Sequence, residues 1–416
     1  PDFWQIDLLA HVAKLSKTGT TLSTYSAAGS VKRALEAVGF SVIKQKGFGR
    51  KRDMITATLH THKTLQANWQ DAAPSVSPSK KALIIGAGIA GISCARALAL
   101  RGWQVTVIEQ ASHAMSAASG NPAAIIYPKL APPHLSAWHF QQQAYLWLLQ
   151  QLRDQPLNAI WQQSGLLWLL AGKQQREGEK LNGHPWPATL VNKVSAEQAS
   201  LLAGCNIDVP CLHFPQAGYL KPQALCQHWL NHDHITTIWR QQVAQLTHDD
   251  GLWSAVNSDG QILAQAPVVI LANAGSARQL TPAANLPLTP VRGQISQFDT
   301  NPALSRLQKV LCYGGYLTPA LPQQHCLGAS FVPHNTDTAI SDEDHQHNFR
   351  LLAGFMPELA AALPPQNTWQ GRAALRAQTP DYLPMVGPLP VHEDFCQRYQ
   401  SLKAGISPAE APIYHP

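Results

Sequence analysis

An apolar run, three spaced glycines, a helical segment, a second apolar run and an acid follow one another in residues 81–109. Residues 82–85 predict a buried parallel strand, and Gly86, Gly88 and Gly91 form a G-x-G-x-x-G pattern at its end. This order of elements predicts a Rossmann-like α/β unit that binds a dinucleotide at the glycine turn.

Each glycine of this turn has a separate mechanical role: the first permits the tight turn, the second lets a pyrophosphate approach the backbone, and the third lets the helix lie close to the strand. Residues 104–108 predict the second strand, and Glu109 ends it. The Glu109 carboxylate can accept both hydroxyls of an adenosine ribose and would repel a 2′-phosphate, so FAD or NAD is expected rather than NADP.

Length and composition limit the class of protein. A chain of 416 residues predicts two or three compact units, and 45% hydrophobic with 13% charged residues is typical of a globular protein. No apolar run approaches the roughly 18 residues that span a bilayer, and no signal peptide opens the sequence. The seven cysteines form no C-x-x-C pair. The closely spaced histidines at positions 60 and 62 and at positions 345 and 347 have no carboxylate or thiol beside them at a metal-ligand spacing. We therefore expect a soluble, cytoplasmic protein without a metal site or a membrane partner.

Positive charge concentrates in one short stretch. The formal net charge is +6, and five basic residues crowd into residues 44–52 around Phe48. Such a cluster can hold nucleic-acid phosphates while the aromatic ring offers a stacking face, but a solvated basic hairpin explains it equally well. The residues proposed to contact RNA are Lys46, Arg50, Lys51 and Arg52.

Three segments are expected along the chain. Residues 1–59 predict a helix, a strand, a helix and a terminal hairpin, which is how the second half of a Rossmann-like methyltransferase ends. The glycine-rich half that would hold S-adenosylmethionine lies outside the sequence, so we expect no site for that cofactor here. Residues 60–79 predict a linker rich in Ala, Pro and Ser, and residues 80–416 the dinucleotide domain.

Within the dinucleotide domain, residues 135–210 and 288–370 are expected to form an inserted α+β substrate subdomain. Residues 268–271 predict another fully apolar strand. If that strand returns to the same sheet, the turn after it brings Ala274 and Gly275 near the cofactor.

Seven separated segments together resemble one family, the bifunctional tRNA 5-methylaminomethyl-2-thiouridine biosynthesis proteins. The resemblance implies an FAD-binding domain of the glutathione-reductase and D-amino-acid-oxidase type, preceded by a methyltransferase. The segments are residues 46–54, 86–109, 118–128, 214–222, 290–296, 310–319 and 375–387.

The family's activity is implied with its fold. The flavin domain removes the carboxymethyl group from 5-carboxymethylaminomethyl-(2-thio)uridine at the wobble position of tRNA, which leaves 5-aminomethyl-(2-thio)uridine. The methyltransferase then methylates the exposed amine with S-adenosylmethionine. FAD and a tRNA anticodon stem-loop are therefore the expected cofactor and partner. The substrate arm is an N-substituted glycine, so the protein must chiefly fix a carboxylate and orient its neighbouring carbon.

The resemblance also suggests roles for residues in the domain. Arg376 lies in the segment that carries the substrate-binding arginine, and a guanidinium grips a carboxylate bidentately. Tyr313 and Tyr316 are alternatives for a hydroxyl to the same carboxylate or for a wall over the flavin, and core packing explains each equally well. Arg292 is expected to contact flavin, substrate or tRNA phosphate. The loop expected to touch the pyrophosphate side of the flavin is Ser119, Gly120 and Asn121.

Two further expectations and two alternatives follow. The family continues beyond residue 416 into a last strand and a glycine-rich turn, so weak FAD retention and impaired activity are expected of this chain.

A small-amine oxidase acting on glycine, sarcosine or a D-amino acid would share the nucleotide unit and Arg376, but it has no reason to carry a methyltransferase segment. A non-enzymatic tRNA-binding module would use only the basic cluster.

Overall fold

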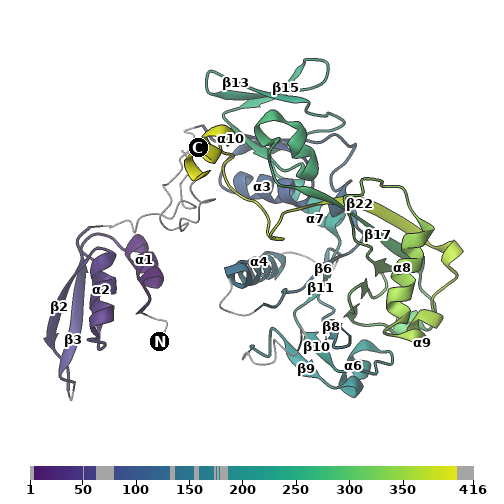
Figure 1. Cartoon of the computed structure of the whole chain (residues 1–416), viewed down its shortest axis with the longest axis horizontal. Coiled ribbons are helices and arrows are strands. Elements are labelled where there is room, and N and C mark those ends of the chain that lie inside the picture. The colour runs from purple at the N-terminus through teal and green to yellow at the C-terminus, as the bar shows by residue number, and fades with distance from the viewer. Residues whose placement is uncertain are drawn as a thin grey trace. The chain divides into compact units, whose positions relative to one another are not determined.

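The computed structural model describes residues 4–49, 51–61, 79–131, 136–153, 159–172, 175, 178 and 186–400. The chain divides into two compact units, residues 1–76 with 388–416 and residues 77–387. Figure 1 labels the helices and strands of the chain. The division falls inside the predicted linker, of which residues 62–78 lie outside the described part. The described residues at the end of the chain include α10 (His392–Tyr399).

The first unit contains the helices and strands predicted for its sequence. Helices α1 (Ile6–Leu15) and α2 (Gly29–Ala37) accompany an antiparallel sheet in the order β1 (Thr21–Thr24), β3 (Asp53–Leu59), β2 (Phe40–Lys46). Apolar side chains from one face of each helix meet those on one face of the sheet, which is the burial that amphipathic spacing predicts. The core includes Leu9, Val31, Leu35, Ile55 and Leu59.

The second unit is built on a parallel sheet of four strands. Their order is β12 (Ile235–Ile238), β5 (Gln104–Ile108), β4 (Lys81–Ile85), β16 (Val268–Leu271), and α3 (Ile89–Ala99) connects β4 to β5. The predicted strand over residues 268–271 does return to this sheet, beside β4. Consequently the turn after β16 lies next to the glycine turn after β4.

The two faces of the parallel sheet have different covers. Ile84 packs with residues of α3 and of α7 (Pro222–Leu230), whereas Leu83 and Ile85 pack with apolar residues of a second, antiparallel sheet. Alternate side chains of a strand point to opposite faces, so residues 82–85 of β4 are all apolar because both faces of the strand are covered. The antiparallel sheet consists of β13 (Gln245–Asp249), β14 (Leu252–Val256) and β15 (Ile262–Ala266).

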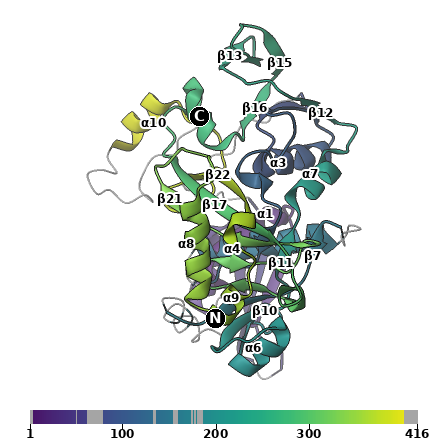
Figure 2. The same cartoon turned by 90° about the vertical axis from the view of Figure 1, so that its right-hand side faces the viewer.

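A larger sheet joins the two segments expected to form the substrate subdomain. Strand β18 (Val310–Cys312) pairs in parallel with β8 (Leu166–Leu169), and β17 (Thr289–Asp299) pairs antiparallel with β22 (Gln370–Gln378). Helix α8 (Asp342–Ala353) runs along the β17 part of this sheet (Figure 2). The other strands are β9 (Asn192–Val194), β10 (Cys211–Phe214), β19 (Tyr316–Leu317), β20 (Gln324–Gly328) and β21 (Val332–Pro333).

The hydrophobic cores of this sheet lie on its two faces. One face is buried under α6 (Ala196–Ala203), α8 and α9 (Pro357–Ala361). On the other side lies a small sheet of β6 (Ala124–Ile126), β11 (Gly218–Leu220) and β7 (Trp161–Gln162). Helix α4 (Ser136–Arg153) shares an apolar cluster with β6 and β7. No helix in the described ranges is long and apolar enough to cross a membrane.

Candidate functional site

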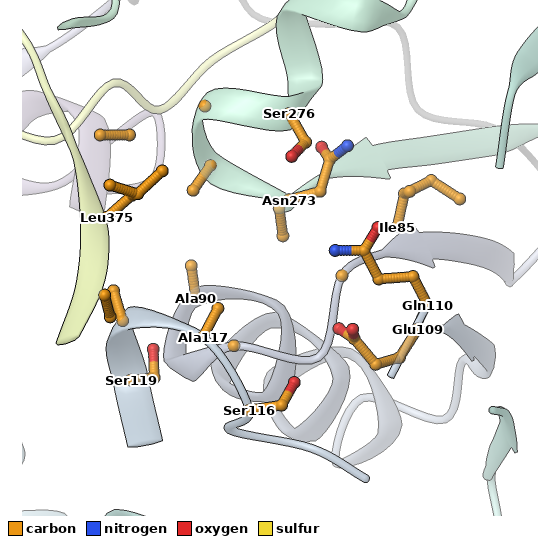
Figure 3. Close-up of a pocket in the computed structure, with 18 of the residues that line it drawn as sticks. Ile85, Ala90, Glu109, Gln110, Ser116, Ala117, Ser119, Asn273, Ser276 and Leu375 are labelled. Atoms are coloured by element: carbon orange, nitrogen blue, oxygen red, sulfur yellow. The ribbon is translucent and has the colours of Figure 1, made fainter. Parts of the chain in front are cut away.

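A cavity of about 820 Å³ opens at the carboxyl ends of β4, β5 and β16. Its size lies within the roughly 300–1,000 Å³ usual for ligand pockets. Glu109 and Gln110 lie at one end of this space and Leu375 of β22 at the other, with Asn273 and Ser119 on opposite walls (Figure 3). The cavity therefore joins the nucleotide unit to the strand that carries Arg376.

The three glycines of the turn differ in what surrounds them. At Gly86, where φ is +103°, an added Cβ would lie 2.8 Å from the carbonyl oxygen of Ala272. At Gly91 an added Cβ would overlap the carbonyl oxygen of Gly86, so this glycine is required for helix and strand to meet. At Gly88, which lines the cavity, the nearest atom would be Ser119 Oγ at 3.3 Å. Only Gly88 is thus free to serve a ligand rather than the fold.

We expect Gly91→Ala and Gly88→Ala to separate folding from binding. Gly91→Ala should destabilise the second unit by about 1–3 kcal/mol or more, because the new methyl overlaps backbone. Gly88→Ala should change the melting temperature little and reduce bound flavin, because its methyl occupies the approach to the turn. Thermal melts and flavin absorbance measure the two effects. Equal melting temperatures for both variants would contradict this assignment.

The Glu109 carboxylate stabilises the glycine turn by accepting hydrogen bonds from the backbone. Its Oε2 accepts the N–H of Ala87 at 2.7 Å, and its Oε1 accepts the N–H of Ala111 at 2.9 Å. The side chain is half-buried and lines the cavity, as expected of a ribose ligand. Each carboxylate oxygen accepts more than one hydrogen bond, so both roles are compatible.

The loop before β6 divides the three residues proposed to contact the cofactor. Ser119 lines the cavity, and its Oγ accepts the N–H of Ile89 at 3.0 Å. Gly120 is buried, and an added Cβ would overlap the carbonyl oxygen of Met115. Asn121 Oδ1 accepts a hydrogen bond from Arg372 Nη1 at 3.1 Å. Gly120 and Asn121 are therefore placed to hold the loop rather than to line the cavity, which differs from their expected role.

The turn after β16 supplies the opposite wall. Asn273, Ala274 and Gly275 all line the cavity, and Ala274 has a φ of +51°. Asn273 Oδ1 is buried and has no hydrogen-bond partner among the described residues. An unsatisfied buried acceptor costs free energy, so this atom suits a ligand that donates a hydrogen bond. Together with the exposed backbone of the glycine turn and the N–H groups at the start of α3, these features fit FAD, which is elongated and carries an anionic pyrophosphate.

Arg376 extends from β22 at the end of the cavity away from Glu109. Its side chain is exposed, lines the cavity, and forms no hydrogen bond or ion pair within the described part of the chain. A Cβ added to Gly293 of β17 would lie 3.3 Å from Arg376 Nη2, so the guanidinium rests against bare backbone. An unpaired guanidinium in a cavity can receive an anion without first breaking an ion pair.

Tyr313 and Tyr316 lie on opposite faces of the large sheet. Tyr316 pairs with Cys312 and packs in the core on the Ile295 side, which is the face of Gly293 and Arg376. Tyr313 is fully buried in the core under α8 and α9. The expected contact of Tyr313 with a substrate carboxylate is thus not supported, because the sheet separates it from Arg376.

Tyr316 remains close enough to Arg376 to interact electrostatically. Burial raises the pKa of the Tyr316 hydroxyl well above its ordinary value, the Cys326 thiol raises it further, and the Arg376 charge opposes this. The hydroxyl therefore stays protonated at neutral pH and can donate a hydrogen bond. Neither tyrosine lines the cavity of about 820 Å³ itself.

Arg292 is a structural residue, contrary to its expected contact with flavin, substrate or tRNA. Its guanidinium is buried, forms an ion pair with Asp344 of α8, and donates to the carbonyl oxygens of Asp337 at 2.7 Å and Ala339 at 2.6 Å. It also donates to Gln294 Oε1 at 3.0 Å. Strand alternation explains the difference from Arg376: Arg376 shares a face with Val291, so Arg292 points the other way.

The basic cluster forms the tip of the β2–β3 hairpin in the first unit. Lys46, Lys51 and Arg52 are exposed, as is Phe48, at 80% of its surface. Arg50 lies outside the described residues. The hairpin is as predicted, and its exposed basic side chains are compatible with contacts to nucleic-acid phosphates and with a solvated surface.

Arg372 is a site residue that the sequence did not reveal. It lies four residues before Arg376 on β22 and donates to the carbonyl oxygen of Ser116 at 2.8 Å, to that of Ala117, and to Asn121. The even spacing of the two arginines was the available signal, since in a strand it places both side chains on one face. In the described ranges no group of three metal-ligating side chains occurs.

Comparisons with known protein families cover nearly the whole chain. The profile of the FAD dependent oxidoreductase family matches residues 81–401. That of an S-adenosyl-L-methionine-dependent methyltransferase family matches residues 1–60. The two matches fall on either side of the predicted linker.

Two relatives that match nearly the whole chain share a name. The tRNA 5-methylaminomethyl-2-thiouridine biosynthesis bifunctional protein MnmC of Chromobacterium violaceum is 37% identical over 424 residues, covering 99% of this chain and 64% of that protein. The MnmC of Methylobacillus flagellatus is 36% identical, covering 94% of this chain and 59% of that protein. The chain thus spans about two thirds or less of the length of these relatives.

Solved structures share the fold at low sequence identity. Glycine oxidase from Bacillus cereus has a TM-score of 0.62 at 17% identity, covering 74% of this chain and 87% of that one. Iminodiacetate oxidase from Chelativorans has a TM-score of 0.61 at 22% identity, covering 80% and 98%. The second unit therefore has the architecture of these oxidases.

Proposed function

The chain belongs to the FAD dependent oxidoreductase family, and on that premise we propose that it acts on tRNA. The proposed reaction removes the carboxymethyl group from 5-carboxymethylaminomethyl-(2-thio)uridine at the wobble position of the anticodon stem-loop and leaves 5-aminomethyl-(2-thio)uridine. The protein in its full length would then methylate that amine with S-adenosylmethionine. A cytoplasmic location agrees with a tRNA substrate.

One observation carries this proposal. A methyltransferase segment in residues 1–60 precedes an oxidoreductase segment in residues 81–401 within one chain. An oxidase of free amino acids has no need of the first segment, whereas two successive reactions on one nucleoside need both. The name shared by the two relatives supports the same substrate.

The substrate arm contains a secondary amine, a CH₂ and a carboxylate. FAD, when bound, supplies the acceptor for the hydride that leaves the CH₂ carbon. Loss of that hydride and of the amine proton gives an imine, and water then hydrolyses it to glyoxylate and the aminomethyl nucleoside. The residues of this chain must therefore fix the arm so that one C–H bond points toward the flavin.

Two side chains are proposed to hold the carboxylate. Arg376 would bind it through two parallel N–H···O hydrogen bonds, which fix both its position and its plane. The protonated Tyr316 hydroxyl, on the same face of the sheet, would donate a further hydrogen bond. No strong general base is required if the amine arrives neutral.

The decisive experiment incubates the full-length protein and FAD with tRNA that carries the carboxymethylaminomethyl nucleoside. Nucleoside mass analysis should show loss of the carboxymethyl group and release of glyoxylate, with the methylated product appearing only when S-adenosylmethionine is added. Turnover of free glycine or sarcosine without any change in tRNA would favour the amine-oxidase alternative and refute the proposal.

We predict that the basic hairpin contributes to tRNA affinity. A plot of the logarithm of the tRNA association constant against the logarithm of salt concentration has a negative slope. Replacing Lys46, Lys51 and Arg52 together by alanine should make this slope shallower by about 2, since each phosphate that a cation neutralises contributes about 0.7–0.9 to its magnitude. Filter binding across a salt series measures this slope.

The matched control removes three exposed cations elsewhere, Arg101, Lys193 and Arg350, and should leave the slope nearly unchanged. The same slope in both triple variants would mean that the hairpin is merely solvated.

A further inference from the structure

A three-pronged contact joins β22 to the loop before β6. Arg372 Nη2 donates to the carbonyl oxygen of Ser116 at 2.8 Å and to that of Ala117, while Nη1 donates to Asn121 Oδ1 at 3.1 Å. The guanidinium therefore holds both the start and the end of residues 116–121, a segment here termed the clamped loop.

The clamped loop lies between Arg372 and the cavity. Ser116, Ala117 and Ser119 line the cavity (Figure 3), and Ser119 Oγ accepts the N–H of Ile89, the first residue of α3. A trans peptide directs its C=O and N–H to opposite sides. Binding the Ser116 carbonyl to Arg372 therefore turns the N–H of Ala117 away from the guanidinium and fixes which side of the loop each group faces.

The contact is shaped for a guanidinium. Arg372 is half-buried, it has no carboxylate partner among the described residues, and burial lowers the pKa of its guanidinium. A Cβ added to Gly120 would lie 2.6 Å from Arg372 Nη2, so the loop approaches closer than other residues would permit. Lysine, with a single compact ammonium, cannot reach three acceptors in this planar arrangement.

We propose that Arg372 is a positioning residue for FAD, acting through the clamped loop. By holding Ser119 against the start of α3 and the loop against the cavity, it prepares that wall before the cofactor binds, and prepared sites bind more tightly. Arg376, on the same face of the same strand, serves the substrate instead. The inference rests on the family's cofactor and is independent of the proposed tRNA substrate.

The test measures the dissociation constant of FAD from the apoprotein of the full-length protein by quenching of flavin fluorescence. Arg372→Met should raise this constant about tenfold or more, and Arg372→Lys should raise it less. In FAD-saturated enzyme the KM for the substrate should stay within about twofold of the wild-type value, because Arg376 is retained. The matched variant Arg376→Met should show the reverse pattern, with an unchanged constant for FAD and a raised KM.

A role in folding alone predicts a different result. Arg372→Met would then lower the melting temperature of the apoprotein and leave the dissociation constant of FAD within about twofold of wild type, which would overturn the proposal. If Arg372→Met does not fold, Asn121→Ala removes one of the three acceptors and should still raise the constant severalfold. An unchanged constant in both Arg372→Lys and Asn121→Ala would also overturn it.

Discussion

Replacing Arg376 with alanine is expected to lower kcat/KM for oxidation of the modified tRNA about 10²- to 10³-fold. Losing the partner of a desolvated charge costs roughly 2–5 kcal/mol, and each 1.4 kcal/mol is a factor of ten. The loss should fall on both parameters, because Arg376 both binds the carboxylate and aligns the neighbouring carbon. Flavin content should be unchanged, since strand β22, which carries the residue, borders the cavity at the end away from Glu109, where Leu375 lies.

Nucleoside mass analysis under single-turnover conditions measures this effect. Arg376→Lys should recover part of the activity, because it restores charge but not the bidentate geometry. Tyr316→Phe should cost less, about tenfold, since it removes a single hydrogen bond from an uncharged donor. Alanine at position 376 with full activity would exclude this residue as the carboxylate ligand.

Replacing Asp344 with alanine is expected to lower the free energy of unfolding of the second unit by about 3–5 kcal/mol. The variant leaves the Arg292 guanidinium buried without its counter-charge, at a site where only 3% of Arg292 is exposed. Chemical denaturation followed by tryptophan fluorescence measures the change. The size of this effect distinguishes a buried structural pair from a surface ion pair, which is worth about 0–1 kcal/mol.

The matched control lies on the same helix. Arg350 of α8 is exposed, and Arg350→Ala should change the free energy of unfolding by less than about 0.5 kcal/mol. Replacing Arg292 and Asp344 together by apolar residues should cost less than Asp344→Ala alone, because no charge then remains unpaired. If Asp344→Ala is no worse than Arg350→Ala, the ion pair does not stabilise the fold and Arg292 becomes available for another role.

Local pattern was sufficient for the nucleotide unit. The glycine turn and its flanking apolar runs predict β4, α3 and β5 closely, because a buried parallel strand and a helix start each impose their own residue types over a few positions. The return of β16 to this sheet was also expected, and with it the position of Ala274 and Gly275 on the cavity wall.

The roles of single polar residues depended on contacts between distant segments. Arg292 and Arg376 lie on neighbouring strands and both resemble functional arginines, yet one is buried by α8 and the other faces the cavity. Tyr313 and Tyr316 are three residues apart and occupy opposite faces. The partner of Arg292 is 52 residues away, so no local pattern could identify it.

The sequence by itself determined the fold class, the dinucleotide turn and the arrangement of a methyltransferase segment before an oxidoreductase segment, because these depend on short-range periodicity and on the order of elements. Only the tertiary structure decided which side chains reach the cavity. Sheet register and long-range packing set that choice: Val291 and Arg292 point to opposite faces of β17, and pairing of β22 with β17 places Arg372 against a loop some 250 residues earlier in the chain.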